Sequence, residues 1–209
     1  MEKVPVNTIN RLIKYRTLLN KLMYEGREYI NSHHIAEMVD TSAAMVRRDL
    51  MYIGANGNPN SGYRITDLEN RLAYFIDPPD GHKVAIVGVG NLGTSLLQYL
   101  YWRCNNISSL IAFDNDPKKI GTEIDGVRVL DIQRMANFIT MFNISIAVLT
   151  LSSEHAQRVT DKLISYGVEG IINYTSARLE VPDGIILENR DIVMSIERIS
   201  LLSRQNGLD

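Results

Sequence analysis

Three glycines in one short loop are the residues whose spacing points most clearly to chemistry. Gly88, Gly90 and Gly93 stand in GVGNLG, between the apolar run KVAIV and the segment LLQYLYW. In a strand-to-helix loop, one such glycine makes the tight turn, one lets a pyrophosphate approach the backbone, and one lets the helix pack on the strand. The helix that follows presents free N–H groups to phosphates. This spacing predicts a dinucleotide site.

An acidic residue follows the glycines at a matching distance. Asp114 ends the apolar segment SLIAFD, 21 residues after Gly93. In dinucleotide folds, an acid about 20 residues after the loop binds the adenosine ribose hydroxyls. Because a carboxylate disfavours the extra phosphate of NADP, we expect NAD(H) as the cofactor. Lys118 and Lys119 leave NADP as the alternative cofactor, although we expect both lysines on a solvated turn after Pro117.

The elements around this loop alternate between short apolar strands and helical segments from KVAIVGVG onward. Such alternation predicts an α/β domain with a parallel sheet covered on both faces. Ligands of these sheets bind at the carboxyl ends of the strands. We therefore expect further pocket residues in the glycine loop and after later strands. They are Asn91, Leu92, Thr150, Asn173 and Tyr174.

The segment from KVAIVGVG onward has few residues suited to catalysis. A dehydrogenase needs a general acid or base near the nicotinamide, and His155 is the only histidine in range, where we expect a helix surface. Cys104 is the only cysteine, so neither a disulfide framework nor a cysteine-rich metal site is predicted. We therefore expect no catalytic residue, no bound metal and no enzyme. An NAD-dependent oxidoreductase with a helical extension remains the alternative.

The N-terminal segment has the apolar spacing of a helix-turn-helix. One helix is expected from Thr8 to Gly26, a second from Ser32, and a third after Ser42. On the third helix, small residues permit close approach to a DNA groove, and arginines reach phosphates or guanine edges. The alternative is an ordinary solvated helix face. The predicted DNA-contacting residues of this helix are Ser42, Ala43, Ala44, Arg47 and Arg48.

A turn and a short strand follow this third helix. The segment ANGNPNSGYRI predicts a wing, on which Arg64 is placed to meet a phosphate. The turn itself carries no lysine or arginine, and residues 1–57 hold eight basic against six acidic residues. Phosphate contacts dominate DNA affinity. We therefore expect modest DNA binding by one chain, with twice the contacts in a dimer.

The segment FIDPPDGH separates the two halves of the chain. We expect a winged-helix domain at 1–77, a Rossmann-like domain at 81–190 and a C-terminal helix at 191–209. The net charge of −2 indicates no overall attraction to nucleic acid or membrane. No apolar run approaches the ~20 residues of a membrane helix. The polar start MEKVPVNTINRL has no features of a signal peptide, so we expect a cytoplasmic protein.

Four segments, in this order, resemble the Rex redox-sensing transcriptional repressors of bacteria. They are TSAAMVRRDL with the following GYRI, then GVGNLG, AFDNDPKKIG, and LEVPDGI with NRDI. The resemblance implies a homodimer that binds double-stranded operator DNA, responds to the NADH/NAD⁺ balance and is released by NADH. It implies that Arg47 and Arg48 lie on the recognition helix and Tyr63 on the wing. It also implies a C-terminal helix exchanged between subunits.

The resemblance further implies a switch made by Tyr99, near the nicotinamide, and Asp191 on the exchanged helix. The sequence departs from the family around this switch, as a divergent member would. Thr17 stands where the family has an arginine, with Arg16 one residue earlier, and the pocket loops at 150–152 and 174–176 are changed. We expect weaker discrimination between NADH and NAD⁺ than in a typical member. A nucleotide- or CoA-binding module without a DNA role is the second alternative.

Overall fold

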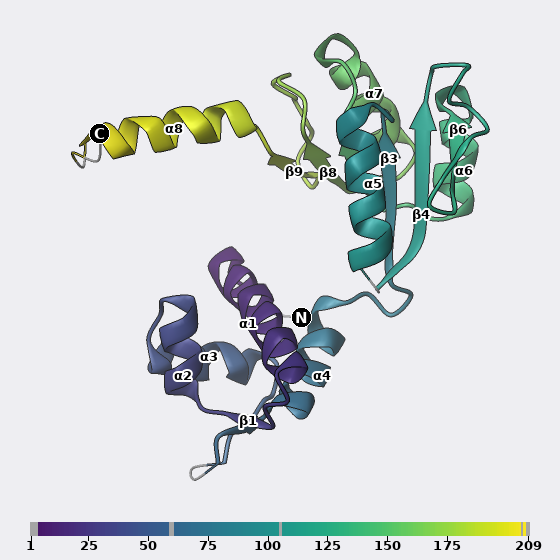
Figure 1. Cartoon of the computed structure of the whole chain (residues 1–209). Coiled ribbons are helices and arrows are strands. Elements are labelled where there is room, and N and C mark those ends of the chain that lie inside the picture. Colours follow the sequence, from purple (N-terminus) through teal and green to yellow (C-terminus); the bar gives the residue numbers. More distant parts are fainter. Residues whose placement is uncertain (1–3, 59–60, 105, 206, 208–209) are drawn as a thin grey trace. The chain divides into compact units, whose positions relative to one another are not determined.

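The structure is a computed structural model that describes residues 4–58, 61–104, 106–205 and 207. The chain divides into two compact units, Met1–Pro79 and Asp80–Asp209 (Figure 1). The division falls inside FIDPPDGH, where two consecutive prolines cannot continue a helix or donate to a sheet. Among the described residues, no helix is both long and apolar enough to cross a membrane.

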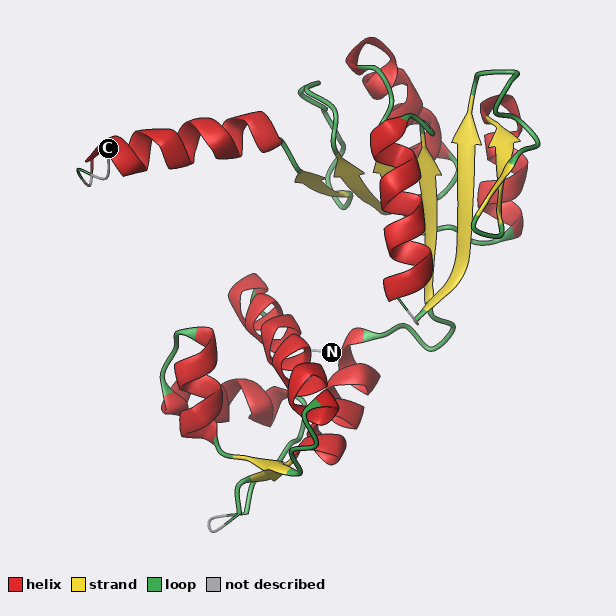
Figure 2. Cartoon of the chain, in the orientation of Figure 1, coloured by secondary structure: helices red, strands yellow, loops and turns green. Residues whose placement is uncertain are grey.

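The described residues of unit 1 form four helices and a two-stranded sheet, and Figure 2 shows these helices in red. Asn31 begins α2 by accepting a hydrogen bond from the His34 N–H at 2.8 Å, and Ser42 begins α3 by accepting one from the Met45 N–H at 3.2 Å. Both are residue types that favour helix N-caps. The elements are α1 (Val6–Tyr24), β1 (Tyr29–Ile30), α2 (Ser32–Val39), α3 (Ala43–Tyr52), β2 (Tyr63–Arg64) and α4 (Ile65–Ile76).

The wing is a small antiparallel sheet. Tyr29 of β1 pairs with Arg64 of β2, and Ile30 pairs with Tyr63. An isolated bridge joins Asn58 to Gly62 across the predicted turn, whose residues 59 and 60 lie outside the described part. The predicted winged helix-turn-helix is confirmed. The sequence analysis did not identify β1 or α4, because a two-residue strand carries no alternation and α4 follows a strand without a break.

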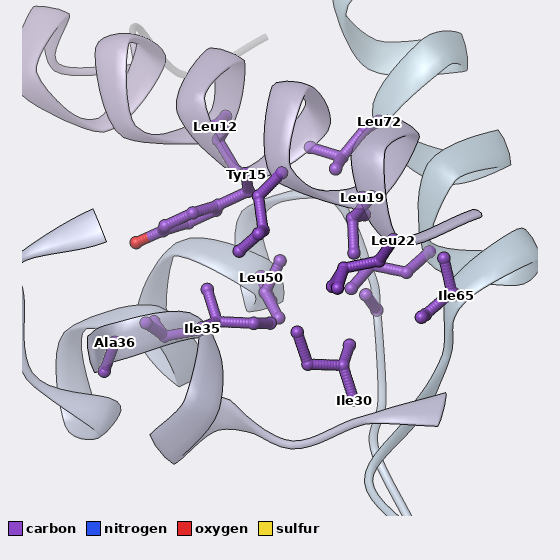
Figure 3. Packing of buried hydrophobic residues seen from close by; sticks show 14 residues of the cluster. Leu12, Tyr15, Leu19, Leu22, Ile30, Ile35, Ala36, Leu50, Ile65 and Leu72 are labelled. Carbon is purple, nitrogen blue, oxygen red and sulfur yellow. The ribbon is translucent and has the colours of Figure 1, made fainter. Parts of the chain in front are cut away.

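Leucine, isoleucine and tyrosine side chains from every helix of unit 1 meet in one core (Figure 3). Leu12, Tyr15 and Leu19 of α1 are fully buried, and they meet Leu50 of α3 and Leu72 of α4. Burying each such leucine stabilises the fold by roughly 1.5–3 kcal/mol. This core fixes α3 against α1 and leaves the opposite side of α3 exposed.

A buried carboxylate strengthens the contact between α1 and α3. Asp49 of α3 is 1 % exposed and accepts hydrogen bonds from Arg11 Nε at 2.6 Å, Arg11 Nη2 at 2.7 Å and the Tyr15 hydroxyl at 2.8 Å. Burial favours the neutral form, but the hydrogen bonds from Arg11 and Tyr15 outweigh it and hold the pKa of the Asp49 carboxyl below its ordinary value. The ionised Asp49 thereby sets the orientation of α3.

Unit 2 is built on a seven-stranded sheet in the order β5-β6-β4-β3-β7-β8-β9. All neighbours are parallel except the hairpin of β5 and β6, which the sequence analysis did not identify. The strands are β3 (His82–Val87), β4 (Ile107–Asp114), β5 (Glu123–Ile124), β6 (Val127–Asp131), β7 (Ile146–Leu149), β8 (Gly170–Asn173) and β9 (Ile186–Asn189).

Helices cover both faces of this sheet, as predicted. Leu97 of α5 belongs to one buried cluster, while Met135 of α6 and Leu163 of α7 belong to another. The last helix, α8, buries none of its residues. The bounds are α5 (Asn91–Arg103), the 3₁₀ turn η1 (Ile132–Arg134), α6 (Met135–Met141), α7 (Ser153–Ser165) and α8 (Ile192–Gln205).

We predict that Asp49→Asn lowers the free energy of unfolding of unit 1 by about 1–3 kcal/mol, because Arg11 loses an ionised partner. The folded-state pKa of Asp49 lies below the unfolded one, so its contribution exists above the unfolded pKa and disappears as the pH falls through the folded pKa. The difference in the free energy of unfolding between the variant and wild type should therefore become smaller below pH 3.8.

Urea unfolding followed by circular dichroism, at pH 7 and at pH 3, measures this effect. Asp40→Asn is the matched control, since Asp40 is exposed and its left-handed backbone, with φ 55°, suits asparagine. An Asp49→Asn variant as stable at pH 7 as Asp40→Asn would refute the role of the buried carboxylate.

Candidate functional site

The glycine loop lies where β3 ends and α5 begins, and its glycines serve different purposes. Gly88 has φ +99°, and a Cβ there would lie 2.8 Å from the Leu151 nitrogen. A Cβ on Gly93 would overlap the Gly88 carbonyl oxygen and lie 2.8 Å from Thr150 Oγ1. In contrast, a Cβ on Gly90 would meet nothing within 4 Å. Gly88 and Gly93 therefore allow close packing, while Gly90 leaves the open side of the loop free.

The Asp114 carboxylate lies beside this loop at the end of β4. It is 5 % exposed and accepts hydrogen bonds from the Val89 N–H at 2.7 Å, the Asp116 N–H at 2.9 Å and Lys119 Nζ at 3.1 Å. Burial raises the pKa of Asp114, but the two backbone hydrogen bonds and the lysine outweigh it, so the pKa stays below its ordinary value. An ionised acceptor is thus held next to the glycine loop.

The position of Lys119 corrects the expectation of a solvated turn. The backbone turns back after Asp116, whose carbonyl accepts the Lys119 N–H at 2.9 Å and whose carboxylate accepts the Lys118 N–H at 2.9 Å. This turn returns the Lys119 side chain to Asp114 and leaves Lys118 exposed. No local pattern distinguishes the two adjacent lysines, because their different positions depend on the geometry of the turn.

A cavity of about 760 Å³ opens from the glycine loop toward α6 and α7. Its volume lies in the range of small-molecule sites. Four predicted residues line it: Gly88, Gly90, Asp114 and Thr150. The apolar side chains of Ile132, Met135, Leu151 and Val159 offer a surface for a flat ring. Lys119, Arg158 and Lys162 add positive charge, and His155 also lines the cavity.

The other predicted pocket residues lie elsewhere. Leu92 and Asp191 line a second cavity of about 560 Å³, together with Tyr174. Asn91 begins α5. Asn173, predicted at the pocket, lines neither cavity, because its side-chain amide donates to the Ala177 carbonyl and to Asn189 Oδ1, both at 2.9 Å.

The two predicted switch residues do not pair within one chain. Tyr99 lies on α5 with its side chain 60 % exposed and lines neither cavity. Asp191 precedes α8 and accepts the backbone N–H groups of Val193 at 2.8 Å and Met194 at 3.2 Å. Among the residues that the structure describes, no hydrogen bond or ion pair joins Tyr99 to Asp191.

Arg16 is held inside unit 1. Its Nη1 and Nη2 atoms donate to the two oxygens of Asp77 at 2.7 Å each, and its Nε lies 3.6 Å from Glu69. Thr17, at the family's arginine position, donates its hydroxyl to the Ile13 carbonyl at 3.1 Å. The bidentate pair fixes Arg16 against the end of α4.

The predicted DNA-contacting residues form one exposed side of α3, with one correction. Ala44 and Arg48 are exposed, and Arg48 makes no side-chain hydrogen bond or ion pair with a described residue. Arg47 donates to the Ser32 hydroxyl at 3.0 Å. Ala43 instead packs against the core, because it begins α3 on the side of the buried stripe.

The wing residues Tyr63 and Arg64 lie on β2, which pairs with β1 and contacts α4. The ring of Tyr63 lies over Gly57, where a Cβ would come within 2.8 Å of the ring. Burial raises the pKa of Tyr63, and the nearby charge of Arg47 opposes that shift. Arg64 is exposed on β2. Tyr63 thus packs against the core of unit 1, where the charge of Arg47 on α3 influences it.

The two units define a class of protein in which a winged helix-turn-helix unit is followed by a Rossmann-type unit with an open glycine loop. Two families match along the chain. Residues 3–50 match the family described as putative DNA-binding protein N-terminus, and residues 80–177 match the CoA binding domain. Among the described residues, no group of three or more His, Cys, Asp or Glu is placed to hold a metal ion.

Full-length relatives narrow this class. The redox-sensing transcriptional repressor Rex of Bacillus licheniformis is 35% identical over 94% of this chain and 92% of the relative. The redox-sensing transcriptional repressor Rex of Anoxybacillus flavithermus is 34% identical over 98% of this chain and 96% of the relative. The solved structure of RSP with beta-NAD⁺ and operator DNA matches with a TM-score of 0.88 and 29% identity, over 100% of this chain and 96% of that one. The solved structure of RSP with beta-NADH matches with a TM-score of 0.85 and 28% identity, over 100% of this chain and 98% of that one. The chain belongs to the Rex family of redox-sensing transcriptional repressors.

We predict opposite outcomes for two substitutions in the glycine loop. Gly93→Ala should destabilise unit 2 by about 1–3 kcal/mol, because its Cβ overlaps the Gly88 carbonyl. Gly90→Val should cost only about 1 kcal/mol, the difference between glycine and valine as a helix N-cap, because its side chain enters open space and its φ of −80° is allowed for valine. Thermal unfolding followed by the fluorescence of Trp102 compares them. Equal destabilisation by both would disprove this division of roles.

Proposed function

We propose that this chain represses transcription by binding operator DNA through unit 1, and that NAD(H) bound in unit 2 regulates that binding. One observation carries the proposal: the ionised Asp114 lies beside the open side of Gly90, in a cavity large enough for an adenosine. The site belongs to a chain that also carries an exposed recognition helix. DNA binding places its action in the cytoplasm.

The nucleotide site fits the chemistry of NAD(H) part by part. The pyrophosphate lies against Gly90 and the N-terminus of α5, where free N–H groups face it. Asp114 accepts the ribose hydroxyls, and the apolar surface with Ile132 and Val159 receives the adenine. The nicotinamide then extends toward the second cavity, at Leu92 and Tyr174. The solved complexes of RSP, at 28–29% identity, contain the same two nucleotides.

The nucleotide acts as an effector rather than as a substrate. His155, the histidine at the main cavity, lies on the adenosine side with Arg158 and pairs with Glu154 at 3.4 Å. It is therefore badly placed for proton transfer at a nicotinamide beside Leu92. An oxidoreductase is the competing proposal, and turnover of a substrate with NAD would favour it.

DNA binding involves the exposed side of α3 and the wing. Ser42, Ala44 and Arg48 enter the major groove, while Tyr63 and Arg64 contact the backbone from β2. Arg47, held by Ser32, contributes positive charge beside them. The solved complex of RSP with operator DNA, at 29% identity, supports operator binding by this chain.

Regulation is weaker than in a typical member of the family. NADH and NAD⁺ differ only at the nicotinamide, so an effector must bind the two protein conformations unequally at that end. Tyr99 and Asp191 are present, but Thr17 replaces the arginine and Asp77 holds Arg16. We therefore expect both nucleotides to bind, with a small difference between their effects on DNA.

We predict that Arg48→Ala weakens operator binding by about 1–3 kcal/mol, because Arg48 is exposed on α3 and has no described partner. A duplex selected by the protein from a random pool serves as the operator, and fluorescence anisotropy gives the dissociation constant with and without NADH. Lys14→Ala is the control, because it removes an exposed positive charge from α1 rather than from α3. Unchanged binding by a folded Arg48→Ala variant would remove α3 from the interface.

We further propose a homodimer held by α8, because seven of its apolar side chains are each at least 50 % exposed. A chain ending at Arg190, or an Ile196→Lys variant, should be monomeric or aggregate, while Glu197→Lys should remain dimeric. Size-exclusion chromatography with light scattering measures this. A stable dimer of the shortened chain would contradict the proposal. The exposed residues are Ile192, Val193, Met194, Ile196, Ile199, Leu201 and Leu202.

A further inference from the structure

A small cavity of about 180 Å³ lies in unit 1 beside the wing. Two of its lining residues are the buried, apolar Leu22 and Ile30. The other lining residues carry hydrogen-bonding side chains, and none of the described lining residues is acidic. They are Arg27, Tyr29, Asn31, His34 and Ser61. A cavity of this size, with a guanidinium and an imidazole in its wall, suits one phosphate-sized anion.

The end of α1 fixes the backbone of Arg27 at this cavity. The helix ends at Gly26, whose φ of 75° is left-handed and whose N–H donates to the Met23 carbonyl at 3.0 Å, while the Arg27 N–H donates to the Leu22 carbonyl at 2.9 Å. The Arg27 side chain is exposed and makes no hydrogen bond or ion pair with a described residue. Its guanidinium therefore has donors available for the oxygens of an anion.

Close packing of the wing on β1 brings Ser61 to the same cavity. The next residue, Gly62, has φ +77°, and a Cβ there would overlap the Ile30 carbonyl oxygen and lie 3.0 Å from the Asn31 Cα. Only glycine permits this approach. Asn31 in turn accepts the His34 N–H at 2.8 Å, which fixes the first turn of α2 beside the cavity. Three segments that are separate in the sequence thus form one wall.

Two contacts place this cavity on the side of unit 1 that carries the proposed DNA-binding residues. Ser32, which follows Asn31, accepts a hydrogen bond from Arg47 of α3 at 3.0 Å. Tyr29 of β1 pairs with Arg64 of β2, and the side chains of such a pair project from the same face of a sheet. Tyr29 lines the cavity, so the exposed Arg64 lies beside it. The cavity therefore continues the surface formed by α3 and the wing.

We propose that this cavity binds one phosphodiester of the DNA backbone, with Arg27 as the main donor to its oxygens and His34 as a second donor. The inference rests on the proposed DNA binding by unit 1 and extends that interface to the end of α1. A backbone phosphate complements the positive wall of the cavity, and a duplex bound along α3 and Arg64 brings phosphates to it. Because every duplex carries the same phosphates, the contact strengthens binding without distinguishing sequences.

The test measures DNA binding by the full chain as a function of salt. Each phosphate contact releases counterions, so the slope of the logarithm of the association constant against the logarithm of the salt concentration changes by about 0.9 per contact. Arg27→Gln should weaken binding at low salt roughly tenfold. It should also reduce the magnitude of that slope by about 0.9 for each bound chain. Both changes should be the same for the selected operator and for an unrelated duplex.

Two further variants separate the charge of Arg27 from its size and position. Arg27→Lys keeps a phosphate-binding cation and should retain the wild-type slope. Lys14→Gln removes an exposed charge of α1 that does not line the cavity, and it should weaken binding by less than about twofold, because salt screens such a charge.

The outcomes distinguish this inference from the proposed function. An Arg27→Gln variant with the affinity and slope of Lys14→Gln, or one that loses affinity for the operator alone, would overturn the phosphate subsite. The proposed function would stand in either case if Arg48→Ala still weakened operator binding. Wild-type protein that binds no duplex at all would overturn the proposed function itself.

Discussion

The close approach of α5 to the end of β3 is the constraint on which unit 2 depends. Gly93 lies against the Gly88 carbonyl with no space for a side chain, and Thr150 Oγ1 donates to that same carbonyl at 2.6 Å. This contact holds the loop so that Gly90 faces open space and the N–H groups of α5 point past it. A hydrogen bond from the Val89 N–H of that loop holds the Asp114 carboxylate beside it. A wider loop would lose both the anion-binding edge and the carboxylate.

In unit 1, ion pairs fix the helices relative to one another. The buried Asp49 orients α3 against α1 and so presents Arg48 to the outside. Arg16 and Asp77 join α1 to the end of α4, immediately before the two prolines that end the unit. In this chain the arginine nearest the family's switch position therefore serves the stability of its own unit. We therefore propose that regulation relies on Tyr99 and Asp191 without this arginine.

Local patterns were sufficient to predict most of this fold and part of the site. The glycine spacing, the distance to Asp114 and the apolar stripe of α1 are set by short-range geometry, so they could be predicted from the sequence. Lys119 and Asn173 could not be placed, because their roles depend on turns that bring them back to Asp114 and to Asn189. The two-residue strands β1 and β5 form only through pairing with partners, which leaves little periodicity to detect.

We propose that a nucleotide bound at the glycine loop of unit 2 controls the DNA affinity of unit 1. The direct measurement is the operator dissociation constant of wild type and of Gly90→Val, each without nucleotide, with saturating NAD⁺ and with saturating NADH. Wild type should bind more weakly with NADH than with NAD⁺, by less than a hundredfold, or about 2.7 kcal/mol. Gly90→Val should bind operator as wild type does and respond to neither nucleotide. A wild type that ignores both nucleotides, or a Gly90→Val variant that NADH still releases, would contradict the account.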